Sequence, residues 1–179
     1  RVTRRQIGVM HTRVAARDAA VVCDLTPLSV LAIEGADAGT FLQGQLSCDV
    51  KGLAPGACRY GSFNSPKGRM LANFALWRDL AGADRYAMLL PEDLAEPVAK
   101  RLRMYVMRSK VSLTDVSADT RRFGVGGPGA ATALRAALGA IPAPQETLQV
   151  GPAILLALPG PRFVVLVPAG DAEALHAQL

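Results

Sequence analysis

Residues 58–78 read CRYGSFNSPKGRMLANFALWR, and this stretch decides the fold class. The spacing predicts a strand over Cys58–Asn64, a turn over Ser65–Lys67 and a partner strand over Arg69–Arg78, because Pro and Gly interrupt two runs that suit strands. Side chains alternate along a strand. One face of the second strand therefore carries Met70, Ala72, Phe74 and Leu76. The stretch is typical of an antiparallel hairpin.

The residues after the hairpin extend it into a mixed unit. Arg85–Leu90 and Val111–Val116 have the composition of strands. Between them, residues 93–108 predict a helix whose apolar residues recur at helical spacing. This expected core stripe consists of Leu94, Val98, Leu102 and Tyr105. Hairpins followed by a covering helix indicate an α+β fold with antiparallel sheets, and not a doubly wound parallel sheet.

The residues before the hairpin predict a strand and a helix. Ser29–Glu34 is rich in aliphatic residues and ends at Gly35. A helix is expected to open at Asp37, with Ala38, Phe41, Leu42, Gln45 and Leu46 on one face at helical spacing. Gly44 interrupts this helix, where glycine costs roughly 1 kcal/mol relative to alanine. It indicates either close packing against a strand or the approach of a ligand to the backbone.

The C-terminal part of the chain predicts a second α+β unit. Strands are expected at Arg122–Val125, Ala153–Leu158 and Arg162–Val167, and helices at Ala130–Leu138 and after Asp171. Residues 124–129 match the pattern GxGxxG. We interpret them as a tight strand-to-helix turn, because the strands that follow suit hairpins and not a dinucleotide-binding βαβ unit.

The predicted domain organisation has three parts. Residues 1–19 are expected to form a flexible basic arm, and residues 51–117 one α+β module that contains the helix over 93–108. Residues 20–50 join residues 118–179 in a second module that is discontinuous in sequence.

The positive charge of the chain is concentrated in its first residues. Five of the 20 basic residues precede the first acidic residue, Asp18, so residues 18–179 carry 15 basic and 15 acidic side chains. The arm is interpreted as a solvated tail, an RNA-contacting segment or an Arg-rich transit peptide. The apolar runs are far shorter than the roughly 20 residues of a membrane span. We therefore expect no membrane partner.

The cysteines predict neither a zinc site nor a disulfide. Cys23, Cys48 and Cys58 contain no C-x-x-C pair, and both histidines, His11 and His176, are distant in sequence. An odd number of cysteines without a secretory signal is typical of reduced thiols, which favours the cytoplasm. No metal ligands are assigned.

Four segments, in order, resemble the YgfZ family of folate-binding proteins, which are related to the glycine cleavage T-protein. The segments are Ile33–Asp37, Phe41–Leu46, Asn64–Met70 and Lys100–Val111. The resemblance implies an α+β fold around a cleft that holds tetrahydrofolate or a related reduced folate. It further implies a role in iron–sulfur cluster assembly or repair, partners among iron–sulfur proteins, and an effect on tRNA modification.

The chain departs from these families at two places. The Lys-Gly-Cys motif of the YgfZ family does not occur here, so the resemblance covers the N-terminal part of the family without its C-terminal barrel domain. The T-protein carries an Asp-Asp pair shortly after the matching glycine turn, where this chain has residues 69–73 without a carboxylate. The fold resembles that of an aminomethyltransferase, whereas aminomethyl transfer is disfavoured because the positioned acid is absent.

The resemblance assigns six residues to the folate cleft. Asn64 and Ser65 are candidates for hydrogen bonds to the pterin, and Lys67 and Arg69 for pairing with the carboxylate tail. Gln43 and Gln45 flank Gly44 and are expected to line the same cleft. The alternative for residues 64–68 is an ordinary hairpin turn with a solvated lysine.

A basic run on the predicted helix leaves two interpretations open. It comprises Lys100, Arg101, Arg103, Arg108 and Lys110. The run is either the solvated back of the helix or a patch for tRNA or an acidic protein. Tyr105 is expected in the core, and Trp77, Met104 and Met107 are expected to serve packing. The functional hypotheses are therefore a folate-binding accessory protein, a folate-dependent aminomethyltransferase and a tRNA-binding module.

Overall fold

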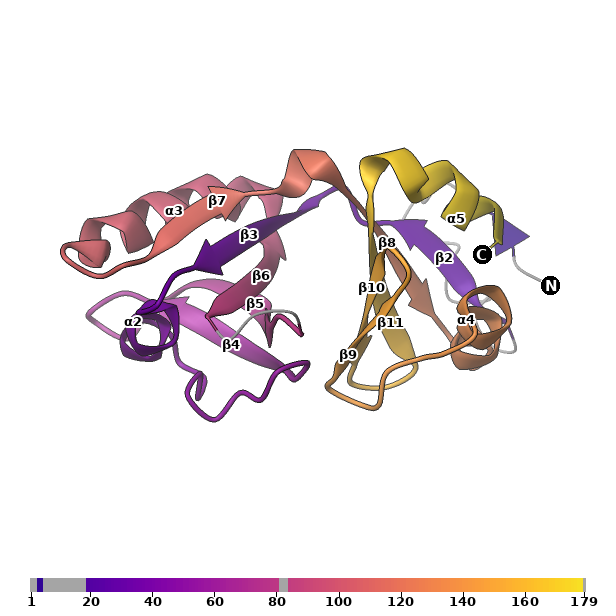
Figure 1. The fold of residues 1–179 in the computed structure, drawn as a ribbon, viewed down its shortest axis with the longest axis horizontal. Helices are drawn as coiled ribbons and strands as arrows, with labels where there is room; N and C mark the ends of the chain where they lie inside the picture. Colours follow the sequence, from indigo (N-terminus) through magenta and orange to yellow (C-terminus); the bar gives the residue numbers. More distant parts are fainter. Residues whose placement is uncertain (1–2, 5–18, 81–83, 179) are drawn as a thin grey trace. The chain divides into compact units, whose positions relative to one another are not determined.

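The computed structural model describes residues 3–4, 19–80 and 84–178. The chain divides into two compact units, each described here by itself (Figure 1). The inner unit comprises Pro27–Ala118, and the split unit comprises Arg1–Thr26 together with Asp119–Leu179. The predicted α+β class with antiparallel sheets and covering helices is confirmed.

The inner unit is built on a five-stranded antiparallel sheet with the order β4-β5-β6-β3-β7. The strands are β3 (Leu28–Glu34), β4 (Cys58–Asn64), β5 (Met70–Arg78), β6 (Arg85–Pro91) and β7 (Ser112–Asp115). β3 lies between β6 and β7, so residues 27–50 belong with residues 51–118. The prediction groups residues 20–50 with the C-terminal module. It differs from the structure at residues 27–50, because the β6 partners of β3 are more than 50 residues away along the chain and local sequence does not reveal them.

Helices α2 (Ala38–Gln45) and α3 (Glu92–Val106) contribute to one hydrophobic core with this sheet. Leu42 and Leu102 from the helices are fully buried with Leu31, Leu76 and Met88 from the strands. Each such side chain contributes about 1.5–3 kcal/mol through burial. The core therefore fixes α3 over the sheet and beside the β4–β5 hairpin.

The β4–β5 hairpin contains an irregularity near its turn. The register shifts between Phe63 and Asn64, so that Asn64 pairs with Met70 whereas Phe63 pairs with Ala72. Ala72, Phe74 and Leu76 share the buried face as predicted, but Met70 is 61% exposed. Its predicted place on that face is wrong, because the extra residue in β5 breaks the alternation.

The split unit is a six-stranded sheet covered by two helices. Its strand order is β1-β2-β8-β11-β10-β9, and only the β1–β2 pair is parallel. The elements are β1 (Thr3–Arg4), β2 (Val21–Asp24), β8 (Thr120–Gly126), α4 (Ala130–Leu138), β9 (Thr147–Val150), β10 (Ala153–Leu158), β11 (Arg162–Pro168) and α5 (Ala172–Gln178). Single-turn 3-10 helices occupy Ser117–Asp119 and Ala169–Asp171.

The glycine-rich segment after β8 forms a strand-to-helix turn. Gly127 has φ +104°, and its carbonyl accepts a hydrogen bond from Ala130 N–H at 3.0 Å. Both neighbours of β8, which are β2 and β11, run antiparallel to it. The topology is therefore not that of a dinucleotide-binding βαβ unit.

The predicted flexible arm over residues 1–19 lies outside the described residues, apart from residues 3–4 and 19. Among the helices of the described residues, none combines the length and the apolar character that crossing a membrane requires.

Candidate functional site

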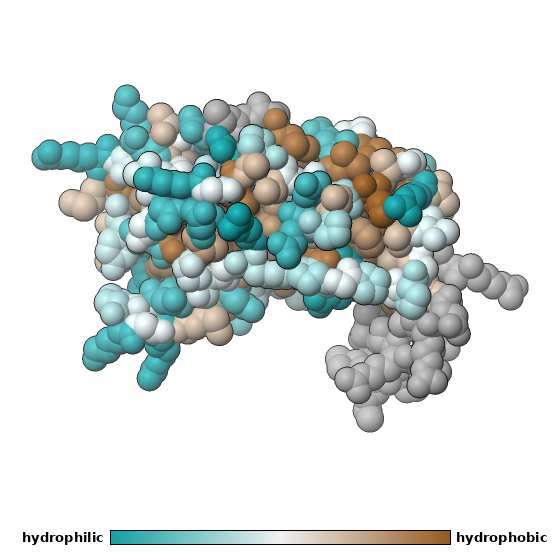
Figure 2. Space-filling view, turned by 90° about the horizontal axis from the view of Figure 1, so that it is seen from below, coloured by the Kyte–Doolittle hydropathy of each residue, from teal (hydrophilic) through white to brown (hydrophobic). Residues whose placement is uncertain are grey.

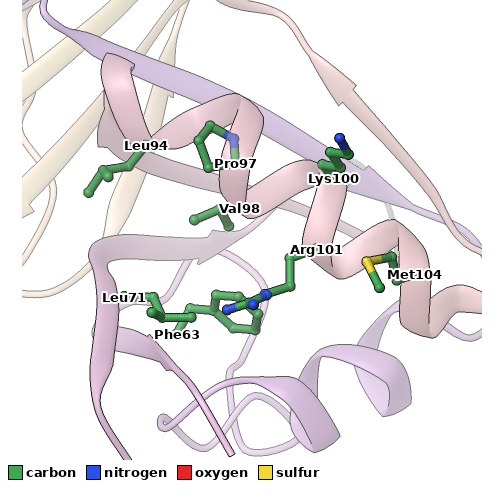
Figure 3. A pocket seen from close by; sticks show the side chains of 8 residues that line it. All are labelled: Phe63, Leu71, Leu94, Pro97, Val98, Lys100, Arg101 and Met104. Atoms are coloured by element: carbon green, nitrogen blue, oxygen red, sulfur yellow. The ribbon is translucent and has the colours of Figure 1, made fainter.

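An open pocket of about 480 Å³ lies between α3 and the β4–β5 hairpin of the inner unit (Figure 3). This volume falls within the range of small-molecule sites, about 300–1,000 Å³. The pocket is lined by Phe63, Leu71, Leu94, Pro97, Val98, Lys100, Arg101 and Met104. Six of these eight side chains are apolar and none is acidic, so the pocket suits an uncharged ring system near an anionic group.

The floor of the pocket comes from the two strands of the hairpin. Phe63 on β4 is 3% exposed and packs in the core, so its ring has little freedom to move. Leu71 on β5 is half-buried beside it. Leu94 and Val98 of α3 face this floor, with Pro97 between them in sequence (Figure 3). The apolar part is therefore built on rigid elements and not on a loop.

The two basic residues of the pocket differ in direction. Arg101 points from α3 toward Phe63, whereas Lys100 points away from it (Figure 3). In the part of the chain that the structure describes, Arg101 forms no ion pair, while Arg103 contacts Glu96 at 3.6 Å and donates to the carbonyl of Leu113 at 3.3 Å. The Arg101 guanidinium is thus available to an anionic ligand at the pocket mouth.

The predicted folate residues of the hairpin turn lie next to the pocket but do not line it. Asn64, Lys67 and Arg69 are exposed. Ser65 organises the turn: its hydroxyl accepts from Arg69 N–H at 3.1 Å, and its carbonyl accepts from Gly68 N–H at 2.8 Å. Contact of these residues with a folate stays a prediction. Their strands supply Phe63 and Leu71 to the pocket.

The predicted residues on α2 have local contacts instead. The side-chain oxygen of Gln43 accepts hydrogen bonds from the N–H groups of Val50 and Lys51, at 2.8 and 2.9 Å. Gln45 is half-buried at the last turn of the helix. A Cβ added at Gly44 would meet nothing within 4 Å, so close packing does not explain this glycine.

The cysteines do not provide a reactive thiolate. Burial raises the pKa of the Cys58 thiol to about 11, and burial also raises the pKa of Cys23 and of Cys48. Because the thiolate is the nucleophile, protonated thiols are poor ones. Within the described residues, no group of three or more His, Cys, Asp or Glu side chains could hold a metal ion.

The pocket itself was not predicted from the sequence, and the end of α3 differs from the prediction. The buried stripe of α3 is Ala95, Val98, Ala99 and Leu102. Tyr105 is 45% exposed, and Met104 and Met107 are 70% and 88% exposed, so their predicted packing roles are wrong. Trp77 is buried as expected. The feature of the sequence that points to the pocket is Pro97, a helix-breaking residue close to Lys100 and Arg101.

Figure 2 shows the molecule from below, with hydrophilic side chains projecting from its surface. The exposed basic run contains Lys100, Arg101 and Arg103 on α3, and Arg108 and Lys110 after it. All five side chains lie at the surface, so both interpretations of this run, a solvated face and a binding patch, are compatible with their exposure.

Comparison with known proteins shows similarity over most of the chain. The family model of the GCVT N-terminal domain matches residues 5–153. The tRNA-modifying protein YgfZ of Shigella boydii is 29% identical over 152 residues, which cover 82% of this chain and 45% of that protein. An uncharacterized protein of Haemophilus influenzae is 35% identical over 88 residues, or 49% of this chain and 31% of that protein. The chain thus spans less than half the length of these curated relatives.

Two solved structures share the fold. The glycine cleavage system aminomethyltransferase T from Bartonella henselae matches with a TM-score of 0.84 and 21% identity, covering 96% of this chain and 48% of that one. Heterotetrameric sarcosine oxidase from Corynebacterium sp. U-96 matches with a TM-score of 0.63 and 18% identity, covering 92% and 86%. These likenesses concern the fold alone. From the match of the family model, the chain belongs to the GCVT N-terminal domain family, and its resemblance to the YgfZ proteins within that family is confirmed.

Proposed function

We propose that this chain is the folate-binding part of a YgfZ-type accessory protein that acts in iron–sulfur cluster assembly or repair. The observation that carries the proposal is the apolar pocket with a free guanidinium at its mouth. A reduced folate combines a flat ring system and an aromatic linker with a carboxylate tail. The ring system suits the walls formed by Phe63, Leu71 and Val98, and the tail suits Arg101.

Leu71 in the floor of the pocket favours folate binding without aminomethyl transfer. Leu71 lies in the segment 69–73 that corresponds to the carboxylate-bearing segment of the T-protein, and it lines the pocket. A leucine cannot orient a folate through a charged hydrogen bond or exchange a proton. We therefore place this chain among accessory proteins, with aminomethyl transfer as the less favoured function.

Calorimetric titration with tetrahydrofolate tests the proposed site. The unmodified chain is expected to bind, and Arg101→Ala to bind about 10–100-fold more weakly, since a charge-assisted hydrogen bond contributes about 1.5–3 kcal/mol. Arg59→Ala is the matched control, because Arg59 is an exposed arginine outside the pocket. Equal affinities of the Arg101 and Arg59 variants for tetrahydrofolate would mean that the folate binds elsewhere. Weaker binding after substitution of Lys67 and Arg69 would place the folate at the hairpin turn.

Turnover separates the two folate-dependent functions. An assay for aminomethyl transfer to tetrahydrofolate is expected to give no activity with the unmodified chain, although it binds the folate. Catalysis at a measurable rate would instead support the aminomethyltransferase function.

A tRNA-binding role is supported by the exposure of the basic run on and after α3 and by the names of the YgfZ relatives. It predicts affinity for tRNA that falls steeply with salt and with substitution of Lys100, Arg103 or Arg108. Cytoplasmic localisation also stays a prediction.

A further inference from the structure

The last turn of α3 and the residue after it expose three large apolar side chains. Met104, Tyr105 and Met107 are 70%, 45% and 88% exposed. Single exposed apolar residues are ordinary on protein surfaces, whereas three within four positions concentrate exposed apolar area at one end of the helix, and concentrated apolar area marks interaction sites.

Basic residues flank these three side chains without acidic neighbours in sequence. Arg101 and Tyr105, like Lys100 and Met104, are four residues apart on α3 and are therefore neighbours on its surface. Arg108 and Lys110 follow the helix and are exposed. No acidic residue occurs between Glu96 and Asp115. The docking surface, defined as Lys100, Arg101, Met104, Tyr105, Met107, Arg108 and Lys110, is thus both apolar and positively charged.

The backbone after α3 is held in place by hydrogen bonds. Ser109 N–H donates to the carbonyl of Val106 at 2.7 Å, and Lys110 N–H donates to the Asp37 carboxylate at 2.7 Å. Met107 has φ +44°, a conformation that is sparsely populated by residues other than glycine, while its side chain stays exposed. A surface held in this way is formed before a partner arrives, which lowers the conformational entropy lost on binding.

We propose that this surface docks an acidic amphipathic helix of a partner protein. The methionines favour such an occupant, because flexible thioether side chains adapt to the apolar face of a helix. Lys100, Arg101, Arg108 and Lys110 complement acidic residues beside that face. A single-stranded nucleic acid would need aromatic platforms on which its bases stack, and Tyr105 is the single aromatic residue of the surface. Lys100, Arg101 and Met104 also line the pocket, so this surface adjoins the proposed folate site, whereas Tyr105, Met107, Arg108 and Lys110 lie outside the pocket.

The experiment measures fluorescence anisotropy of a labelled synthetic helical peptide of about four turns, with leucine at positions i, i+3, i+4 and i+7 and glutamate at most others. The unmodified chain is expected to bind, and the double variant Tyr105→Ser, Met107→Ser to bind at least about tenfold more weakly. Arg108→Glu is expected to weaken binding similarly. Arg59→Glu is the matched control and is expected to bind as the unmodified chain does.

Two further measurements keep the inference falsifiable. Circular dichroism and tetrahydrofolate titration of the Tyr105→Ser, Met107→Ser variant are expected to be unchanged, because neither residue lines the pocket. Loss of folate binding alone would therefore concern the proposed function and not this surface. If the double variant loses helical signal, the Arg108→Glu variant carries the test, because the Arg108 side chain is exposed.

Three results would overturn the inference. The first is equal binding of a peptide of the same composition with its leucines dispersed around the helix, which would indicate charge alone. The second is a single-stranded RNA that binds more tightly than the peptide and keeps its affinity in the Tyr105→Ser, Met107→Ser variant. The third is self-association in sedimentation velocity that disappears in the double variant, which would make a second copy of the chain the occupant.

Discussion

The Asp37 carboxylate accepts a hydrogen bond from the backbone N–H of Lys110 at 2.7 Å, across 73 positions of sequence. Asp37 directly precedes α2, yet its side chain bonds the loop between α3 and β7 and not the N-terminus of its own helix. This bond therefore positions the loop that carries Arg108 and Lys110 of the docking surface. Asp37→Ala is expected to lower the free energy of unfolding by about 1 kcal/mol, measured by urea denaturation. Asp84→Ala, which removes an exposed carboxylate, should leave it nearly unchanged.

The same loop leaves no room for a side chain at residue 35, so only glycine fits there. Gly35 has φ +130°, and a Cβ at this position would overlap the carbonyl oxygen of Lys110. Gly35→Ala is expected to destabilise the chain by at least about 1–3 kcal/mol, since both backbone strain and the clash with a fixed carbonyl act together. Thermal unfolding measures the loss. A melting temperature equal to that of the unmodified chain would mean that the loop moves freely.

Substitution of Gly44 by alanine is expected to stabilise the chain, which is the opposite of the effect at Gly35. This glycine lies within α2, and its missing Cβ faces open space. Gly44→Ala should raise the free energy of unfolding by about 0.5–1 kcal/mol, because alanine restricts the unfolded chain and favours the helix. Measured beside Gly35→Ala, it separates a steric requirement from simple helix propensity. If Gly44→Ala also weakens tetrahydrofolate binding, the ligand approaches this helix.

The two glutamines of α2 should differ in their effect on stability. Gln43→Ala leaves the N–H groups of Val50 and Lys51 without the acceptor that both now share. We expect a loss of about 1–2 kcal/mol in equilibrium unfolding. Gln45→Ala is the matched control and is expected to cost less than half as much. An equal cost would mean that the two hydrogen bonds accepted by Gln43 contribute nothing specific to stability.

The Cys58 thiol predicts a distinct dependence on pH. Its pKa in the fold is about 11 because of burial, above its ordinary value of 9.0. The folded chain therefore keeps this proton where the unfolded chain releases it, so the contribution to stability is complete below pH 9 and is lost as the pH rises toward 11. Cys58→Ala should flatten this part of the stability profile. Alkylation by iodoacetamide at pH 8, followed by mass spectrometry, should modify Cys58 only after unfolding.

Local patterns in the sequence were sufficient for much of the fold. The bounds of β4, α4 and β10 agree with the predicted Cys58–Asn64, Ala130–Leu138 and Ala153–Leu158. Both α4 and β10 are bounded directly by Gly or Pro, and Gly or Pro lies two residues from each end of β4. By contrast, β2 and β9, which have four residues each, were not predicted, whereas β7, which is equally short, lies within the predicted strand Val111–Val116.

Properties that depend on distant partners could not be predicted. Membership of β3 in the inner unit depends on its pairing with β6 and β7, which the local sequence does not encode. The exposure of Tyr105 has the same origin: helical spacing assigns it to the core stripe, but burial requires a partner above that turn. The pocket combines residues from β4, β5 and α3, and a single segment does not reveal this combination.

The sequence of the inner unit is inserted within that of the split unit, so the two units are completed at different times during synthesis. Entry and exit of the inner unit lie side by side, since Val30 N–H donates to the Ser117 hydroxyl and Val116 N–H donates to the Val30 carbonyl. On the ribosome, this unit is complete before β8 is translated, whereas β2 pairs with β8 through contacts such as Val22 with Val125. Strand β2 must therefore wait about 100 residues for its antiparallel neighbour, and we expect the inner unit to fold first as the nascent chain emerges.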